Sequence, residues 1–255
     1  MYLRVIACEA ICREVCHLAA RSANVIDLQF LDMAAHNEPK GGRKTIQQAL
    51  DATPANRYDA VLLGYGLCGQ IADGLRTRRH KVVIPRAHDC IGLLLGSRAR
   101  RAAELAQAPG TYFYSAGWLD GRKRARRRAQ APESASLPAF AAYGFAEAYE
   151  GWVRKYGPER AQILLEETNA WRAGYQRGVW IDFDFLRPLG MEKEVRAICE
   201  REGWRFETLP GDLGLLERWL EGRWNQQEFL TAPPGTRIAA TYDDRVIDSV
   251  PEEGE

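Results

Sequence analysis

The chain has 255 residues, enough for one large domain or two small ones. Apolar residues make up 46% and charged residues 27%, which excludes a disordered, collagen-like or fibrous protein. The net charge of +1 gives no global field to attract nucleic acid or an anionic membrane, so we expect neither as a partner.

The chain has no run that approaches the ~20 apolar residues of a membrane span. Its first residues become polar at Glu9, too soon for the apolar region of a secretory signal. We therefore expect a cytoplasmic protein, in which six cysteines are thiols, metal ligands or reactive groups before they are disulfides.

Residues 2–118 alternate between β-rich apolar runs and helically spaced segments. The predicted strands are 2–8, 24–31, 58–63, 81–85 and 111–115. The predicted helices are 10–20, 45–52, 70–76 and 91–106. Because the connections are short and the strands are apolar throughout, we predict an α/β fold with a doubly wound, mostly parallel, Rossmann-like sheet.

The alternation breaks near residue 120 and resumes after 176. A basic run at 122–128 predicts a solvated loop, and helices are predicted at 140–156 and 158–173. The later predictions are strands at 177–185, 204–208 and 236–241, a helix at 191–202 and a helix that opens near Asp212. We thus expect a single domain over 1–255: a βα core (1–118), a basic loop and helices (119–175), returning βα units (176–242) and a fraying acidic tail (243–255).

Three cysteines follow predicted strands. Cys8 ends the first strand, Cys68 follows strand 58–63 and Cys90 follows strand 81–85. Because the carboxyl ends of parallel strands meet at one edge of a sheet, we expect the three thiols to converge on one metal ion or cluster. His88 can add a zinc ligand two residues before Cys90, with Asp89 orienting it.

The other three cysteines are predicted to pack in the core. Cys12 and Cys16 lie one turn apart in the predicted helix 10–20, and Cys199 lies inside the predicted helix 191–202.

A glycine-rich run overlaps Cys68. Gly64-Tyr-Gly66-Leu-Cys-Gly69 follows a predicted strand, and Asp89 comes twenty residues after Gly69. This is the outline of a dinucleotide-binding motif, with Asp89 as the acceptor for a ribose hydroxyl. The predicted helix that follows is short, however, and the motif lies on the third strand of the fold.

Several of these motifs together resemble the uncharacterised bacterial and archaeal family catalogued as domain of unknown function 1638. The resemblance rests on Ile6-Ala-Cys8, Gly64 to Gly69, Asp89-Cys90-Ile91 leading to Gly96, and Gly110 to Trp118. It implies cysteines at the positions of Cys8, Cys68 and Cys90, whereas the position of His88 varies, which favours a three-thiolate site. The genes of this family often lie beside corrinoid-dependent methyltransferases, which implies a link to one-carbon metabolism but no particular reaction.

Three functions stay open at this point. The first is a metalloprotein in which Cys8, Cys68 and Cys90 hold a [4Fe–4S] cluster or zinc, with one position open for a small-molecule substrate, as in a lyase or methyltransferase. The second is a non-catalytic accessory protein that docks on a methyltransferase or corrinoid protein through residues 122–128. The third is a nucleotide-binding oxidoreductase that uses the run from Gly64 to Gly69.

Overall fold

The computed structural model describes residues 1–33, 39–128, 152–169 and 174–252. The chain divides into two compact units, where the sequence predicts one domain. Unit 1 comprises Met1–Ala103 and Gly211–Glu255, and unit 2 comprises Glu104–Pro210. No helix in these described ranges is both long and apolar enough to cross a membrane.

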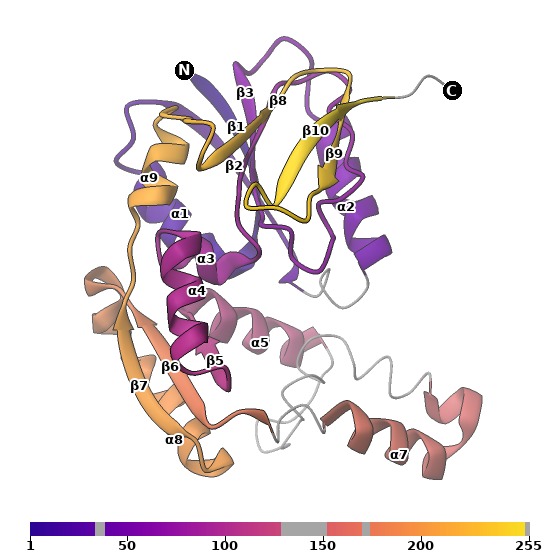
Figure 1. The fold of residues 1–255 in the computed structure, drawn as a ribbon, viewed down its shortest axis with the longest axis vertical. Helices are drawn as coiled ribbons and strands as arrows, with labels where there is room; N and C mark the ends of the chain where they lie inside the picture. Colours follow the sequence, from indigo (N-terminus) through magenta and orange to yellow (C-terminus); the bar gives the residue numbers. More distant parts are fainter. Residues whose placement is uncertain (34–38, 129–151, 170–173, 253–255) are drawn as a thin grey trace. The chain divides into compact units, whose positions relative to one another are not determined.

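Unit 1 contains a five-stranded sheet, a two-stranded sheet and short helices (Figure 1). Its strands are β1 (Tyr2–Cys8), β2 (Val25–Leu31), β3 (Ala60–Gly64), β4 (Val82–Pro85), β8 (Phe229–Ala232), β9 (Thr236–Ala240) and β10 (Ile247–Pro251). Its helices are η1 (Glu9–Ile11), α1 (Cys12–Ala19), α2 (Pro39–Asp51), α3 (Cys90–Leu94), α9 (Gly214–Leu220) and most of α4 (Arg98–Gln107).

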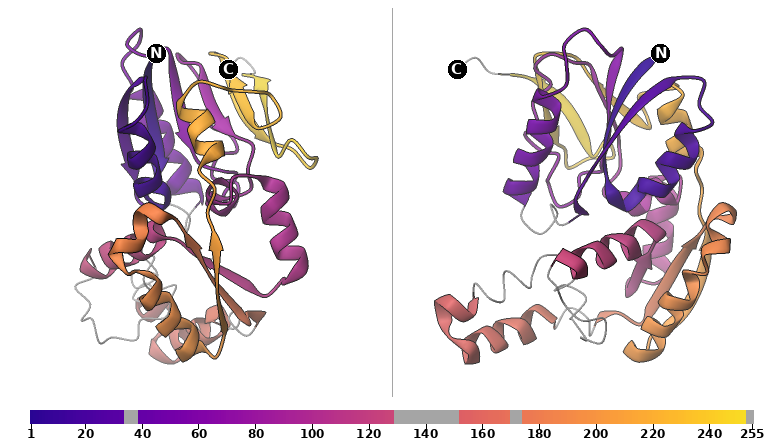
Figure 2. Two further views of the ribbon diagram at one scale, coloured as in Figure 1. Left: turned by 90° about the vertical axis from the view of Figure 1, so that its left-hand side faces the viewer. Right: turned by 180° about the vertical axis from the view of Figure 1, so that it is seen from behind.

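The larger sheet has the strand order β2-β1-β3-β4-β8. The first four strands are parallel, and β8 pairs antiparallel with β4. Helix α2 lies on one side of this sheet, and α1 and α9 lie together on the other, so the central strands are covered on both faces (Figures 1 and 2). The prediction of an α/β fold with a mostly parallel central sheet is confirmed, and the continuous burial of β3 and β4 explains why their sequences are apolar throughout.

Several predicted elements of unit 1 are wrong in detail. Residues 70–76 form turns and not a helix. The predicted helix 91–106 is two helices, because Gly96 adopts φ +78°, which no helical residue can have. The acidic tail contains a regular strand, β10, which pairs with β9 from Ile247 to Pro251. Strand β9 therefore belongs to a separate sheet.

Unit 2 is built on a second, three-stranded parallel sheet with the order β5-β6-β7. Its elements are β5 (Thr111–Tyr114), α5 (Ala116–Arg128), α7 (Pro158–Asn169), β6 (Arg177–Asp182), η5 (Asp184–Leu189), α8 (Glu192–Glu202) and β7 (Arg205–Pro210). Helix α8 packs on β6 and β7 (Figure 2). A Cβ atom at position 178 would overlap the Cys199 sulfur, so glycine at this position leaves space for that thiol. Strand β5 thus joins this sheet and not the one predicted.

The basic run at 122–128 is helical and not a loop. It forms the second half of α5, and the Arg122 side chain is buried, with its guanidinium 5.6 Å from the centre of the Trp118 ring. Lys123 pairs with Glu194 at 3.0 Å. Most of the predicted helix 140–156 lies outside the described residues.

Candidate functional site

Cys8, Cys68 and Cys90 come from three successive connections at one edge of the larger sheet. Cys8 is the last residue of β1, Cys68 follows β3, and Cys90 is the first residue of α3 after β4. Strands β1, β3 and β4 are adjacent and parallel, so their carboxyl ends face the same way. Strand β2 lies on one side of β1 and β3 on the other, so the edge includes a point where the strand order reverses, the usual place for a ligand in an open α/β sheet.

The Cys8 thiol is fixed by the turn that ends β1. Cys8 precedes the 3-10 helix η1, and its sulfur accepts a hydrogen bond of 3.5 Å from the backbone N–H of Ala10. The side chain is only 2% exposed. This hydrogen bond caps η1 and holds the Cys8 thiol at the sheet edge.

The loop that carries Cys68 is bonded to the loop that carries Cys90. The Leu67 N–H donates to the Ala87 carbonyl at 2.8 Å, and the Cys68 N–H donates to the His88 carbonyl at 2.7 Å. Cys68 itself has φ +46°, a left-handed conformation that few residues other than glycine adopt. Such strain persists only where the surrounding structure imposes it, and it occurs often at functional sites.

Gly66 allows the two loops to approach each other. A Cβ atom there would lie 2.7 Å from the Ala87 oxygen and 2.7 Å from the Asp89 nitrogen, both of them backbone atoms. No side chain fits in that space. The closeness of the Cys68 and Cys90 loops therefore depends on the absence of a side chain at Gly66.

Asp89 places Cys90 at the start of α3. Its Oδ1 accepts from the Gly92 N–H at 3.1 Å, which caps the helix. The same carboxylate accepts from the Arg101 Nε at 2.8 Å and forms an ion pair with that guanidinium. The Cys90 side chain is half-buried.

The three thiols lie in one another's electrostatic field. Burial is the main cause that raises the pKa of each thiol. The next cause is Cys90 for the pKa of Cys8, Cys8 for that of Cys68, and Cys68 for that of Cys90. All three thiols are therefore protonated at neutral pH, and ionisation of one would oppose ionisation of the next.

Three further side chains belong to this edge, and the sequence analysis missed them. Burial raises the pKa of the Tyr65 hydroxyl, and Cys8, Cys68 and Glu9 add to that shift. Glu9 is buried and its Oε1 accepts from the Met33 N–H at 3.1 Å. Glu14 is fully buried in α1 and raises the pKa of Cys90. The one sequence signal was their position: Tyr65 lies inside the glycine run, and Glu9 follows Cys8 directly.

The thiols are neighbours without being arranged around a metal. Among the described residues, no group of three His, Cys, Asp or Glu side chains lies close enough to hold one metal ion as the side chains stand. His88 is exposed, and it contributes its backbone carbonyl to the Cys68 loop. The structure thus places Cys8, Cys68 and Cys90 at one sheet edge, and the His88 side chain is exposed.

The predicted core positions of two other cysteines are wrong. Cys16 is exposed on α1, and Cys12, the first residue of that helix, is half-buried. Cys199 is fully buried in unit 2 against Gly178, as predicted.

The glycine run lacks the surroundings of a dinucleotide site. The described residues 65–81 form turns and contain no α-helix, so no helix N-terminus follows Gly69. A Cβ at Gly64 would lie 2.5 Å from the Ala7 Cβ on the neighbouring strand, and Gly66 faces the Ala87 carbonyl. Packing thus accounts for both glycines, and Asp89 is occupied by Gly92 and Arg101.

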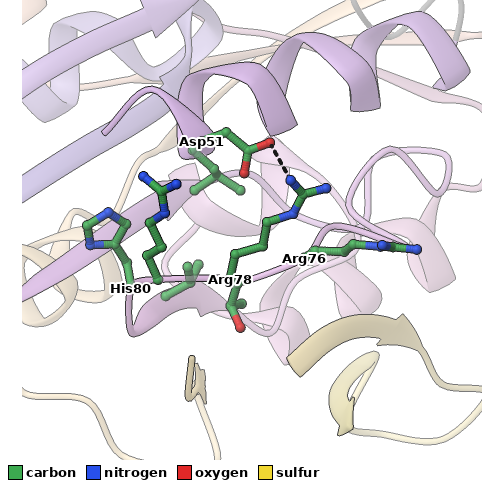
Figure 3. A pocket seen from close by; sticks show the side chains of 8 residues that line it. Asp51, Arg76, Arg78 and His80 are labelled. Atoms are coloured by element: carbon green, nitrogen blue, oxygen red, sulfur yellow. Dashed lines mark ion pairs between the residues drawn. The ribbon is translucent and has the colours of Figure 1, made fainter. Parts of the chain in front are cut away.

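A small basic pocket lies at the other end of β4, before its first residue. Figure 3 shows that the side chains of Arg76, Arg78 and His80 point in different directions, and Arg78 pairs with Asp51 at 3.6 Å. The His80 Nε2 lies 3.1 Å from the Thr53 carbonyl oxygen. The open space is about 10 Å³, which is about the volume needed for one water molecule. This pocket is therefore too small to bind a substrate, and its basic side chains do not point toward a common centre.

One protein family matches most of the chain. The family described as "Protein of unknown function (DUF1638)" matches residues 30–220, which include Cys68 and Cys90 and begin after Cys8. No curated protein and no solved structure matches the chain. Since the match covers well over half of the 255 residues, the chain belongs to the DUF1638 family.

Proposed function

We propose that unit 1 binds a thiophilic metal centre, a [4Fe–4S] cluster or a zinc ion, through Cys8, Cys68 and Cys90. The observation that carries this proposal is the placement of three thiols, from three separate connections, at the carboxyl ends of the adjacent parallel strands β1, β3 and β4. Buried single cysteines are common, but three at the ends of adjacent strands, beside a point where the strand order reverses, are not explained by packing.

The donor set suits a soft metal. Thiolates select zinc and iron–sulfur clusters over hard cations. Three protein thiolates leave one coordination position for a substrate, in a cluster with one open iron or in a catalytic zinc site. With Cys8, Cys68 and Cys90 as ligands, such a centre would supply Lewis-acid chemistry toward a hydroxyl or carboxylate if it is a cluster, or toward a thiol if it is zinc. These chemistries fit a lyase or a methyltransferase, in keeping with the methyl-transfer context that the family resemblance implies.

The protein supplies two properties to such a centre. The hydrogen bonds between the Cys68 and Cys90 loops hold two of the ligands at a fixed backbone separation, so binding requires side-chain rotation more than loop folding. Burial excludes water and keeps the thiols protonated in the absence of metal. Metal binding must therefore release protons, and the affinity must rise with pH.

The test is anaerobic purification of the full chain, followed by metal analysis and a visible spectrum. A brown protein with broad absorbance at about 400 nm indicates a cluster, and a colourless protein with bound zinc indicates the mononuclear site. Cys8→Ser, Cys68→Ser and Cys90→Ser should each lose most of the metal. Cys199→Ala, in the core of unit 2, is the matched control and should retain it. Equal metal content in all four variants would overturn the proposal.

A further inference from the structure

Three cysteines that follow one another in the sequence, Cys8, Cys12 and Cys16, range from buried at the proposed centre to exposed on the surface of α1. Cys8 ends β1, Cys12 begins α1 and Cys16 lies one turn further along α1. Their exposure changes in the same order: Cys8 is buried, Cys12 is half-buried and Cys16 is exposed. Packing does not explain an exposed thiol at Cys16, because that side chain buries little apolar surface.

Helix geometry places Cys12 and Cys16 within reach of a shared metal ion. Cys12 and Cys16 stand at i and i+4 of one helix, where Cβ atoms are about 5–6 Å apart on one face. Metal–sulfur bonds of about 2.3 Å allow one ion to bridge two such thiolates. Between Cys8 and Cys12 the chain forms the tight 3-10 turn η1, and the Cys12 N–H donates to the Glu9 carbonyl.

We infer that Cys12 and Cys16 form a second, surface site for a soft divalent metal ion, which receives the ion and passes it inward to Cys8, Cys68 and Cys90. This inference rests on the proposed function of the buried site. Transfer is a sequence of ligand exchanges. A thiol loses its proton to solvent as its sulfur bonds to the metal, and the sulfur that is displaced takes up a proton. No electrons are exchanged, and the ion keeps its charge throughout.

The inference predicts a kinetic effect without an effect on the final state. An ion that is already bound at the surface meets the buried thiols at an effective concentration on the order of millimolar, as for other tethered ligands. With Cd²⁺ supplied at about 0.1 mM, the surface site should therefore speed loading by roughly tenfold, which corresponds to about 1.4 kcal/mol in the barrier.

The experiment mixes the metal-free, reduced full chain with Cd²⁺ in a stopped-flow instrument and follows the ultraviolet absorbance of the cadmium–thiolate bonds. The double variant Cys12→Ser/Cys16→Ser should load about tenfold more slowly than the wild type and reach the same tightly bound Cd²⁺ content after gel filtration. Ala20→Ser is the matched control, because Ala20 is exposed one further turn along the same face and carries no thiol.

Each outcome separates the relay from the buried site. Equal loading rates in the wild type and the double variant would overturn the relay while Cys8→Ser still loses bound Cd²⁺. A lower final content in the double variant would also overturn it, because Cys12 or Cys16 would then be a ligand of the final site. If the wild type and Cys8→Ser retain the same Cd²⁺ after gel filtration, the proposed function fails, and the relay fails with it.

Discussion

Gly66→Ala should loosen the candidate site by separating the two loops that carry Cys68 and Cys90. The new methyl group would lie within 3.0 Å of the Ala87 oxygen and of the backbone nitrogen and Cα of Asp89. Backbone atoms cannot rotate away as the end of a side chain can, so the loops must move apart. That movement breaks the hydrogen bonds from the Leu67 and Cys68 N–H groups to the Ala87 and His88 carbonyls.

The expected cost follows from these contacts. Inserting one methyl group into a close-packed position costs about 1–3 kcal/mol. The two hydrogen bonds contribute about 0.5–1.5 kcal/mol each. Because the loops can partly relax, we expect the free energy of unfolding of unit 1 to fall by about 3 kcal/mol. Native-state hydrogen exchange at the amides of β1 and β3 measures this value for unit 1 alone, without mixing in unit 2.

Gly69→Ala is the matched control on the same loop. Gly69 has φ +65° but no heavy atom within 4 Å of the position of a Cβ. Its substitution therefore carries only the left-handed backbone penalty of about 1 kcal/mol. The reasoning is refuted if Gly66→Ala costs no more than Gly69→Ala, or if Gly66→Ala retains full metal content after anaerobic purification.

Three further expectations concern the titration, capping and reactivity of the site. Because burial raises the pKa of Cys8, Cys68 and Cys90, the metal-free folded chain keeps protons that the unfolded chain loses above about pH 8.5. Its stability should be unaffected by these thiols below that pH and fall as the pH rises further, by up to about 1.4 kcal/mol per pH unit for each thiol. Urea titrations at several pH values measure this fall, and Cys8→Ser should make it shallower; an unchanged slope contradicts the assignment. Asp89→Ala removes both the α3 cap and the partner of Arg101 and should cost about 1–2 kcal/mol, whereas Asp89→Asn keeps the cap and should cost less than about 1 kcal/mol; equal costs in thermal unfolding would show that the cap is unimportant. Iodoacetamide should modify the exposed Cys16 before the buried Cys8, Cys68 and Cys199, as read by peptide mass spectrometry, and the reverse order would contradict the burial described above.

The local sequence pattern carried the information for most strands of unit 1. Continuous apolar runs predicted β3 and β4 close to their observed bounds, because a strand buried on both faces needs apolar side chains at every position. The run of β1 was also predicted, although Arg4 interrupts it and Tyr2 is exposed. The cysteines stand next to those runs, so their position at the carboxyl ends also followed from the sequence. The common placement of Cys8, Cys68 and Cys90 at one sheet edge was predictable for this reason, and not from their spacing.

Other features depend on pairing between distant segments, which local periodicity does not encode. Strand β5 has the composition of the predicted sheet but pairs with β6, more than sixty positions later in the chain (Thr111 with Arg177). Strand β8 pairs with β4 although all residues of unit 2 lie between them in the sequence. Strand β10 forms within a segment whose acidic composition predicts fraying. Strand pairing is a non-local choice, since the same short apolar run can pair with any strand that the rest of the fold brings to it.

For the candidate site, too, some features followed from the local sequence and others only from the tertiary structure. The sequence by itself determined which thiols reach the sheet edge, because strand ends are local features. Only the tertiary structure decided that Tyr65, Glu9 and Glu14 are buried beside them, that the His88 ring is exposed, and that Gly66 serves loop packing and not a pyrophosphate. Burial and close backbone approach arise when separate loops pack together, and a side chain's own neighbours in the sequence do not reveal which loop will cover it.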